Sequence, residues 1–205
     1  MELCNCFAKP LGLKVAIQTI MPTNKIILGA LGGLTAGLTA SVVMNLFQRG
    51  LSKWLGGEQR SHGAQSLQTG TPDHGAGRYL TNIGAESPTD DAAERTANII
   101  SVGLMDHPLS EKQKDIGGTI FHYVFGATSG VVYGVTSELI PSIRFGWGLP
   151  FGAVVWLIAD ETVVPALGLS KDARKYPTST IAYAFAAHLV YGLATEATLK
   201  VLRPQ

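Results

Sequence analysis

The side chains of this sequence that could do chemistry lie where charge is otherwise scarce. Two histidines, two carboxylates and an amide interrupt long apolar stretches: Asn45, His122, Asp160, Glu161 and His188. Imidazole changes its charge near neutral pH and binds metals, and carboxylates carry protons or cations. Because an ionised group is costly away from water, it needs a partner or a function in such a place. These five residues form the candidate polar cluster.

The apolar stretches around this cluster are long enough to be membrane-spanning helices. They cover residues 26–48, 116–140, 147–164 and 180–199, and together they hold four charges, all acidic. About 20 mostly apolar residues cross the ~30 Å hydrocarbon core of a bilayer. A soluble all-α domain is the alternative, but its core helices normally carry Lys or Arg on one face, and these stretches contain neither. The sequence predicts an all-α polytopic membrane protein with a four-helix transmembrane bundle.

Helix rise places the cluster in one half of that bundle. Asp160 lies about 14 residues into the third stretch, at a depth that corresponds to roughly residue 126 on the second and 185 on the fourth. His122 and His188 are therefore within about one turn of Asp160 and Glu161 in depth, and Asn45 is near the same side. Two further carboxylates, Glu138 and Glu196, are predicted at the opposite membrane face.

Several chemistries fit such a cluster. A proton or cation conduit or sensor would use carboxylates and histidines whose pKa values respond to burial and partner charge. Two imidazoles with carboxylates could also bind a metal, and two histidines on neighbouring helices could hold haem. The simplest alternative is that the histidines and carboxylates satisfy each other and set helix register in a structural or accessory protein. The last hypothesis is preferred, and no cofactor is predicted.

The remaining segments are predicted to lie in water or at the membrane surface. Residues 1–25 are an N-terminal segment in which 11–21 could form an interfacial helix, and 200–205 are a tail. Cys4 and Cys6 cannot complete a tetrahedral metal site alone. The aqueous loop 49–115 is expected to be irregular up to an amphipathic surface helix over about 88–104, capped at Ser87 and Pro88. A capping box from Ser110 to Gln113 then begins the second span.

Glycines at every fourth residue indicate where the helices meet. Small residues with this spacing allow the backbones of membrane helices to approach closely. The pattern predicts either packing inside the bundle, a glycine zipper, or a seam with a second copy or a larger membrane complex. The glycines concerned are Gly29, Gly33 and Gly37 on the first span, Gly126, Gly130 and Gly134 on the second, and Gly148 and Gly152 on the third.

Composition and motifs argue against several classes of function. Charged residues make up 15% of the chain, whereas about 25% is usual in a soluble domain. The net charge of +1, without a basic stripe, disfavours nucleic acid as a partner. The sequence has no Walker loop, no G-x-S-x-G and no H-E-x-x-H motif, so enzymatic activity is not expected. The expected partner is the lipid bilayer.

Short words between residues 120 and 200 resemble a known family in their order and spacing. They are His122-Tyr123, Phe125-Gly126, Tyr133, Glu138, Phe151-Gly152, Trp156, Asp160-Glu161, Pro165-Ala166-Leu167-Gly168-Leu169, Ala187-His188-Leu189-Val190-Tyr191-Gly192 and Glu196. Together they resemble the YagU-type family of small bacterial inner-membrane proteins. The first span departs from the family pattern, which has more tryptophan and charge just after it. The resemblance implies a multi-pass protein in the bacterial inner (cytoplasmic) membrane and implies no reaction, because the biochemical function of that family is unknown.

Overall fold

The computed structural model describes residues 11–55 and 68–203, and all of its regular elements within these ranges are helices. The long helices are α1 (Leu11–Leu55), α4 (Glu111–Leu139) and α7 (Thr178–Leu202). Between α4 and α7, α5 (Leu149–Ile158) continues through a π-helical turn, η3 (Ala159–Val163), into α6 (Val164–Ala166). The predicted all-α class is confirmed. Cys4, Cys6 and the loop residues 56–67 lie outside the described residues.

The four predicted spans correspond to these helices, with shifted ends. The stretch at 26–48 lies within α1, which is one continuous helix from Leu11, so the expected interfacial segment and the first span are not separate there. The stretch at 116–140 belongs to α4, which begins earlier because the predicted capping box at Ser110 and Gln113 is present. The third and fourth stretches match α5–η3–α6 and α7.

Two of these segments pass a combined test of length and apolarity for crossing a membrane. They are Asn24–Leu51 within α1 and Leu149–Ala166 across α5, η3 and α6. The finding suggests a membrane protein.

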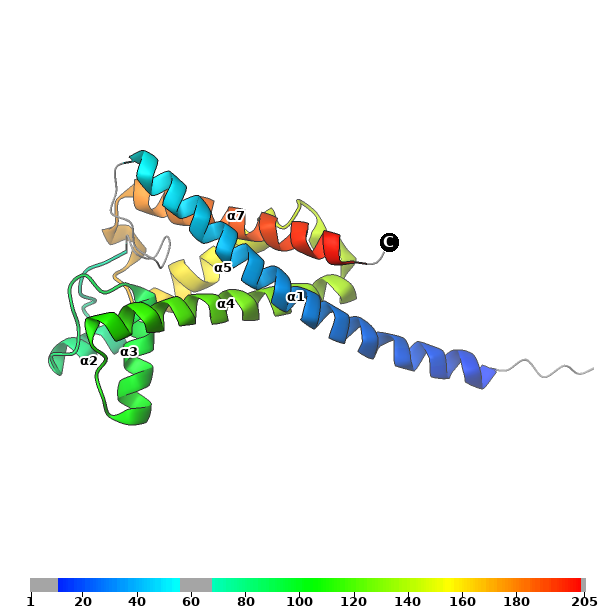
Figure 1. Ribbon diagram of the computed structural model, residues 1–205, viewed down its shortest axis with the longest axis horizontal. Helices are drawn as coiled ribbons and strands as arrows, with labels where there is room; N and C mark the ends of the chain where they lie inside the picture. The colour runs from blue at the N-terminus through cyan, green and yellow to red at the C-terminus, as the bar shows by residue number, and fades with distance from the viewer. Residues whose placement is uncertain (1–10, 56–67, 204–205) are drawn as a thin grey trace, which may run out of the picture.

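α4 and α7 run in the same direction, and α1 crosses both of them obliquely in the opposite direction (Figure 1). α1 lies against α4 and α7, and α5 lies against α7. Gly29 of α1 approaches the end of α4 near Gly134, while Gly37 approaches Gly126, so α1 and α4 are antiparallel. The N-terminal part of α1 extends past the other helices (Figure 1).

Glycine residues allow the helix backbones to approach each other most closely. A Cβ atom on Gly33 would lie 2.3 Å from the carbonyl oxygen of Gly130, and one on Gly37 would lie 2.4 Å from that of Gly126. α5 and α7 meet in the same way, since a Cβ atom on Gly152 would lie 2.1 Å from the carbonyl oxygen of His188. The side chains buried beside these contacts include Ala36, Ala40, Met44, Ala184, Ala187 and Tyr191.

Residues 68–110 form a small cap at one end of the bundle (Figure 1). It contains α2 (Gly75–Asn82) and α3 (Ala92–Met105) and packs through α3 against α4. The expectation of an irregular loop before residue 87 was wrong at α2. Sequence analysis could not predict α2, because its start is held by distant residues. The amide groups of Ala76 and Gly77 donate to the carbonyl oxygens of Leu167 and Gly168.

α3 begins one turn later than its sequence predicts. Asp91, rather than Ser87, caps it, because the Asp91 side chain accepts from the amides of Ala93 and Glu94 and the Glu94 carboxylate accepts from the Asp91 amide. The inward face of α3 is also unexpected. It is polar at Arg95 and Asn98, whereas the apolar Leu104 is exposed.

The glycine contacts between α1 and α4 generate a stability prediction. Gly33→Leu should lower the free energy of unfolding by at least about 1–3 kcal/mol, because the new side chain has no room against the α4 backbone. Thermal unfolding of the purified protein in detergent, followed by circular dichroism, measures this. Gly103→Ala is the control, since a Cβ atom on Gly103 of α3 would meet nothing within 4 Å and alanine favours the helix. Equal melting temperatures for both variants would contradict the packing argument.

Candidate functional site

The structure brings together one histidine and one carboxylate of the predicted polar cluster. Nδ1 of His188, on α7, lies 3.7 Å from Oδ2 of Asp160, in η3. Both residues are buried, with 5% of His188 and 2% of Asp160 exposed. The same nitrogen lies 2.9 Å from the carbonyl oxygen of Ala184. Because a carbonyl can only accept, this contact assigns the ring proton to Nδ1.

The π-helical turn changes the direction of the side chains around Asp160. A π turn adds one residue to a helix and is frequently found at functional sites. Here it spans Ala159–Val163, buries Asp160 against α7 and leaves Glu161 half-buried beside it. Oε1 of Glu161 is buried and accepts no hydrogen bond from the residues that the structure describes.

Asn45 and His122 have other neighbours. Nδ2 of Asn45 donates to the hydroxyl of Tyr123 over 3.1 Å and so joins α1 to α4. One turn on, Gln48 is buried, and its backbone oxygen accepts from the hydroxyl of Tyr183 over 3.0 Å. The ring of His122 stands edge-on to that of Tyr123, with ring centres 5.7 Å apart.

His122 also lines a cavity of about 390 Å³ between α4 and the α5–α6 segment. Ala92 and Thr96 of α3 close it at the cap end, and Phe151 of α5 lies at the other end. Apart from His122 and three hydroxyl residues, its lining is apolar. The sequence contains no local signal for this cavity, because its walls come from separate helices.

Glu138 and Glu196 meet at the bundle end away from the cap, in a network closed by Arg203. Nε of Arg203 lies 3.0 Å from Glu138, and its Nη1 lies 3.1 Å from Glu196. Nη2 of Arg203 donates to Oγ of Ser137 over 2.8 Å. Arg144 also contacts Glu138, at 2.9 Å.

Tyr133 extends this network into the bundle. Its hydroxyl donates to Oε2 of Glu196 over 3.0 Å. The two carboxylates were predicted as interfacial groups, and the ion pairs with Arg144 and Arg203 give each of them a specific partner. The arginines lie beyond the ends of the apolar stretches, so sequence analysis did not connect them with these acids.

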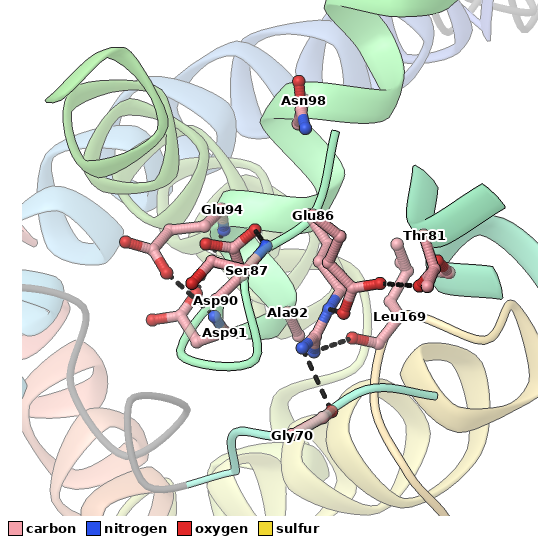
Figure 2. A network of polar contacts seen from close by, with 12 residues as sticks. Gly70, Thr81, Glu86, Ser87, Asp90, Asp91, Ala92, Glu94, Asn98 and Leu169 are labelled. Carbon is pink, nitrogen blue, oxygen red and sulfur yellow. Dashed lines mark hydrogen bonds and ion pairs between the residues drawn. The ribbon is translucent and has the colours of Figure 1, made fainter. Parts of the chain in front are cut away.

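The cap is organised around Arg95, whose side chain is fully buried. Figure 2 labels its partners Glu86, Leu169 and Gly70. Nε of Arg95 lies 2.9 Å from Glu86, and its two terminal nitrogens donate to the carbonyl oxygens of Leu169 and Gly70 over 2.9 and 3.0 Å. The other oxygen of Glu86 accepts from Thr81. Arg95 therefore ties α2, α3 and the turn after α6 into one unit. Its partners are 9, 25 and 74 residues away, which explains why no local motif marks it.

A second buried pair attaches the cap to α4. Nζ of Lys114 lies 2.8 Å from Asp90 and 2.7 Å from Glu111. Burial lowers the pKa of Lys114, but the hydrogen bonds and charges of these two acids outweigh it, so that its pKa lies above the ordinary value. Asn98 adds a neutral link by donating to Ala85 and accepting from the amide of Leu109.

Tyr176 links the turn after α6 to the start of the cap. Its hydroxyl donates to the carbonyl oxygen of Gln68 over 3.2 Å and accepts from the amide of Lys171 over 3.1 Å. Burial raises the pKa of this phenol, which stays protonated at neutral pH.

Comparison with protein families identifies a family for the central and C-terminal part of the chain. A model of the family described as a protein of unknown function, DUF1440, matches residues 86–197, more than half of the chain. The chain belongs to the DUF1440 family. The match runs from Glu86 in the cap to Ala197 at the far end of the bundle, and it does not include α1. Comparison with curated proteins and with solved structures finds no match.

The DUF1440 assignment is compatible with the resemblance to the YagU-type family and adds no reaction. Within residues 11–55 and 68–203, no three His, Cys, Asp or Glu side chains are grouped so as to hold a metal ion. The expectation of no cofactor stays a prediction, and the absorption spectrum and metal content of the purified DUF1440 protein would test it against the haem or metal alternative.

The buried Arg95 generates a prediction for the cap of this DUF1440 protein. Arg95→Met should destabilise the cap by about 3–5 kcal/mol, because it leaves the Glu86 carboxylate buried without its counter-charge. Limited proteolysis should then cut within residues 68–110 well before the bundle helices.

Two variants make this prediction sharp. Arg78→Met removes an exposed arginine of the same cap and should leave proteolysis unchanged. Glu86→Gln combined with Arg95→Met should recover part of the loss, because no unpaired charge is then left buried at this position. If Arg95→Met and Arg78→Met are cut at the same rate, Arg95 does not hold the cap.

Proposed function

We propose that this chain is a four-span integral protein of the bacterial inner membrane, with a structural or accessory role. In this role its buried polar residues hold the helices in register, and its cap lies at one membrane surface. One observation carries the proposal: apolar side chains face outward and polar side chains are buried, which is the reverse of the distribution in a soluble helical bundle. Outward positions on the four long segments are apolar, for example Leu31, Val124, Leu157 and Leu193, whereas Asn45, Asp160, His188 and Glu196 are buried.

The burial of polar side chains between helices also explains why α4 and α7 are only modestly apolar on average. At 29 and 25 residues these helices are about 43 and 37 Å long, more than the ~30 Å hydrocarbon core. Residues such as Ser137, His188 and Glu196 lower their average apolarity but are buried between helices. Polar residues inside a membrane normally face the bundle interior, which supports counting all four segments as spans.

Charge is distributed as a spanning bundle requires. Arg144 and Arg203 lie at one end, and Lys114 and Arg95 lie at the cap end. A chain of four spans places these two ends on opposite sides of the bilayer. The resemblance to the YagU-type family supports the inner membrane as the location.

Single cysteines test the four-span arrangement. In a background with Cys4 and Cys6 replaced by serine, Lys112→Cys and Arg174→Cys should react with a membrane-impermeant maleimide from one side of the membrane. Ser142→Cys, in the turn between α4 and α5, should react from the other side only. All three positions are exposed or nearly so in the fold, so that burial does not limit the reaction.

Leu31→Cys is the matched control for this labelling experiment. Leu31 is 59% exposed in the fold, so a soluble protein would react there, whereas a membrane span would not until it is solubilised. Reaction of Leu31→Cys in intact membranes, or of all the other positions from one side, would overturn the four-span proposal.

A second function, a proton or cation conduit or sensor, is favoured by one specific observation. Asp160 of the π-helical turn forms a buried pair with His188 of α7, and Glu161 lies beside Asp160 with one buried oxygen that receives no described hydrogen bond. Intramembrane ionisable residues are functional candidates by default. This observation supports a site at which a proton or cation could be held.

Proteoliposomes distinguish the two functions. If the conduit function holds, Asp160→Asn with Glu161→Gln should abolish proton or cation flux that the unchanged protein catalyses, with folding preserved. Asp106→Asn is the matched control, because it removes an exposed carboxylate at the left-handed end of α3, where asparagine fits well. Identical flux in all three proteins, or no flux in any, removes the conduit function and leaves the structural role.

A further inference from the structure

The cavity between α4 and the α5–α6 segment has a shape that neither proposed function uses. It separates the two segments along their length and ends where the rings of Tyr133 and Phe151 stack, with centres 4.3 Å apart. At the cap end, Ala92 and Leu169 close it. The cavity is therefore a slot that runs along the helices and is bounded at both ends.

The size of this slot selects the form of its occupant. The α4 wall extends from Phe121 to Val132, which is about 16 Å of helix. A helix is at least about 10 Å wide with its side chains, so a helical segment of that length would need more than about 1,000 Å³. The slot offers about 390 Å³. An extended hydrocarbon chain fits within it along its length, whereas a helix of a partner or of a second copy could lie only partly inside it.

The chemistry of the wall selects a hydrocarbon. No Asp, Glu, Lys or Arg side chain lines the slot. The hydroxyl of Thr96 donates to the carbonyl oxygen of Ala92, and that of Thr128 donates to the carbonyl oxygen of Val124, so these threonines can turn their methyl groups to the slot. Apart from His122, the described residues of this wall are apolar or carry a hydroxyl, so the wall fits an uncharged chain.

The slot is continuous with the apolar outer surface of the bundle. Val132 and Val154, on its two walls, are 59% and 50% exposed, and Phe125 and Ile158 are also exposed. In the four-span arrangement this surface faces lipid. A length of about 16 Å is close to that of one leaflet, which is half of the ~30 Å hydrocarbon core.

We infer that this slot binds one acyl chain of a membrane phospholipid, whose head group stays outside the slot. The inference rests on the four-span proposal for the source of the chain. The site would make the lipid part of the bundle by filling the space between α4 and α5.

A photoreactive phospholipid tests the inference. The protein is reconstituted with phosphatidylethanolamine that carries a diazirine within one acyl chain, irradiated, digested and analysed by mass spectrometry. Cross-links should concentrate on residues that line the slot, in particular on α4 between Phe121 and Val132. Val132→Trp combined with Val154→Trp, which places bulky rings at both lips, should abolish them.

The matched control is Val124→Trp combined with Leu157→Trp. These residues lie on the same two helices, are 56% and 53% exposed, and do not line the slot. This variant should keep the slot cross-links. Ser129→Phe fills the slot from its half-buried wall and gives an independent loss if the first variant does not fold.

The outcomes separate this inference from the four-span proposal. Cross-links spread evenly over the outer surface and unchanged by the tryptophans at Val132 and Val154 would overturn it. Labelling by a photoreactive free fatty acid, without labelling by the phospholipid, would overturn the phospholipid as occupant. Cysteine labelling tests the four-span proposal by itself. That proposal can fail while the protein in detergent still takes up the acyl probe in the slot.

Discussion

The close approach of glycine backbones is the constraint on which the rest of this bundle depends. Where Gly33 faces Gly130, no side chain fits between the helices, so bulky apolar residues are displaced to the outer surface. The interior is left to small residues and to polar groups that reach a partner on the next helix. Asn45 can bond Tyr123 because α1 and α4 lie so close together. The close approach of the glycine backbones therefore accounts both for the proximity of the helices and for the pairing of polar side chains between them.

The buried polar groups are layered along the bundle, and the layers differ in character. The network of Arg203, Glu138 and Glu196 contains charges of both signs and joins the ends of α4 and α7. The second layer, by contrast, pairs Asp160 of the π-helical turn with His188 of α7 and has a neighbouring carboxylate in Glu161. The first layer resembles a structural clamp, whereas the second has the exchangeable groups that proton or cation chemistry needs.

The cap and the slot are two consequences of one arrangement. Arg95 ties the turn after α6 to α2 and α3, which positions α3 across the start of α4. From there α3 closes the cap end of the slot through Ala92 and Thr96. The buried polar network of the cap therefore also determines the boundary of an apolar site, although the two share no side-chain chemistry.

What the sequence by itself determined is local: the helical stretches, the glycines at every fourth residue and the capping box at Ser110 all depend on neighbours within a turn or two. The side-chain partners were decided by tertiary structure. Depth estimates placed His122 and Asn45 in the same layer as Asp160, and only the structure shows that Asn45 donates to Tyr123 and that His122 lines the slot wall. Arg95 and α2 escaped prediction because their contacts reach up to 74 and about 90 residues along the chain. A helix pattern specifies rise and period, whereas rotation about the helix axis depends on what the helix packs against.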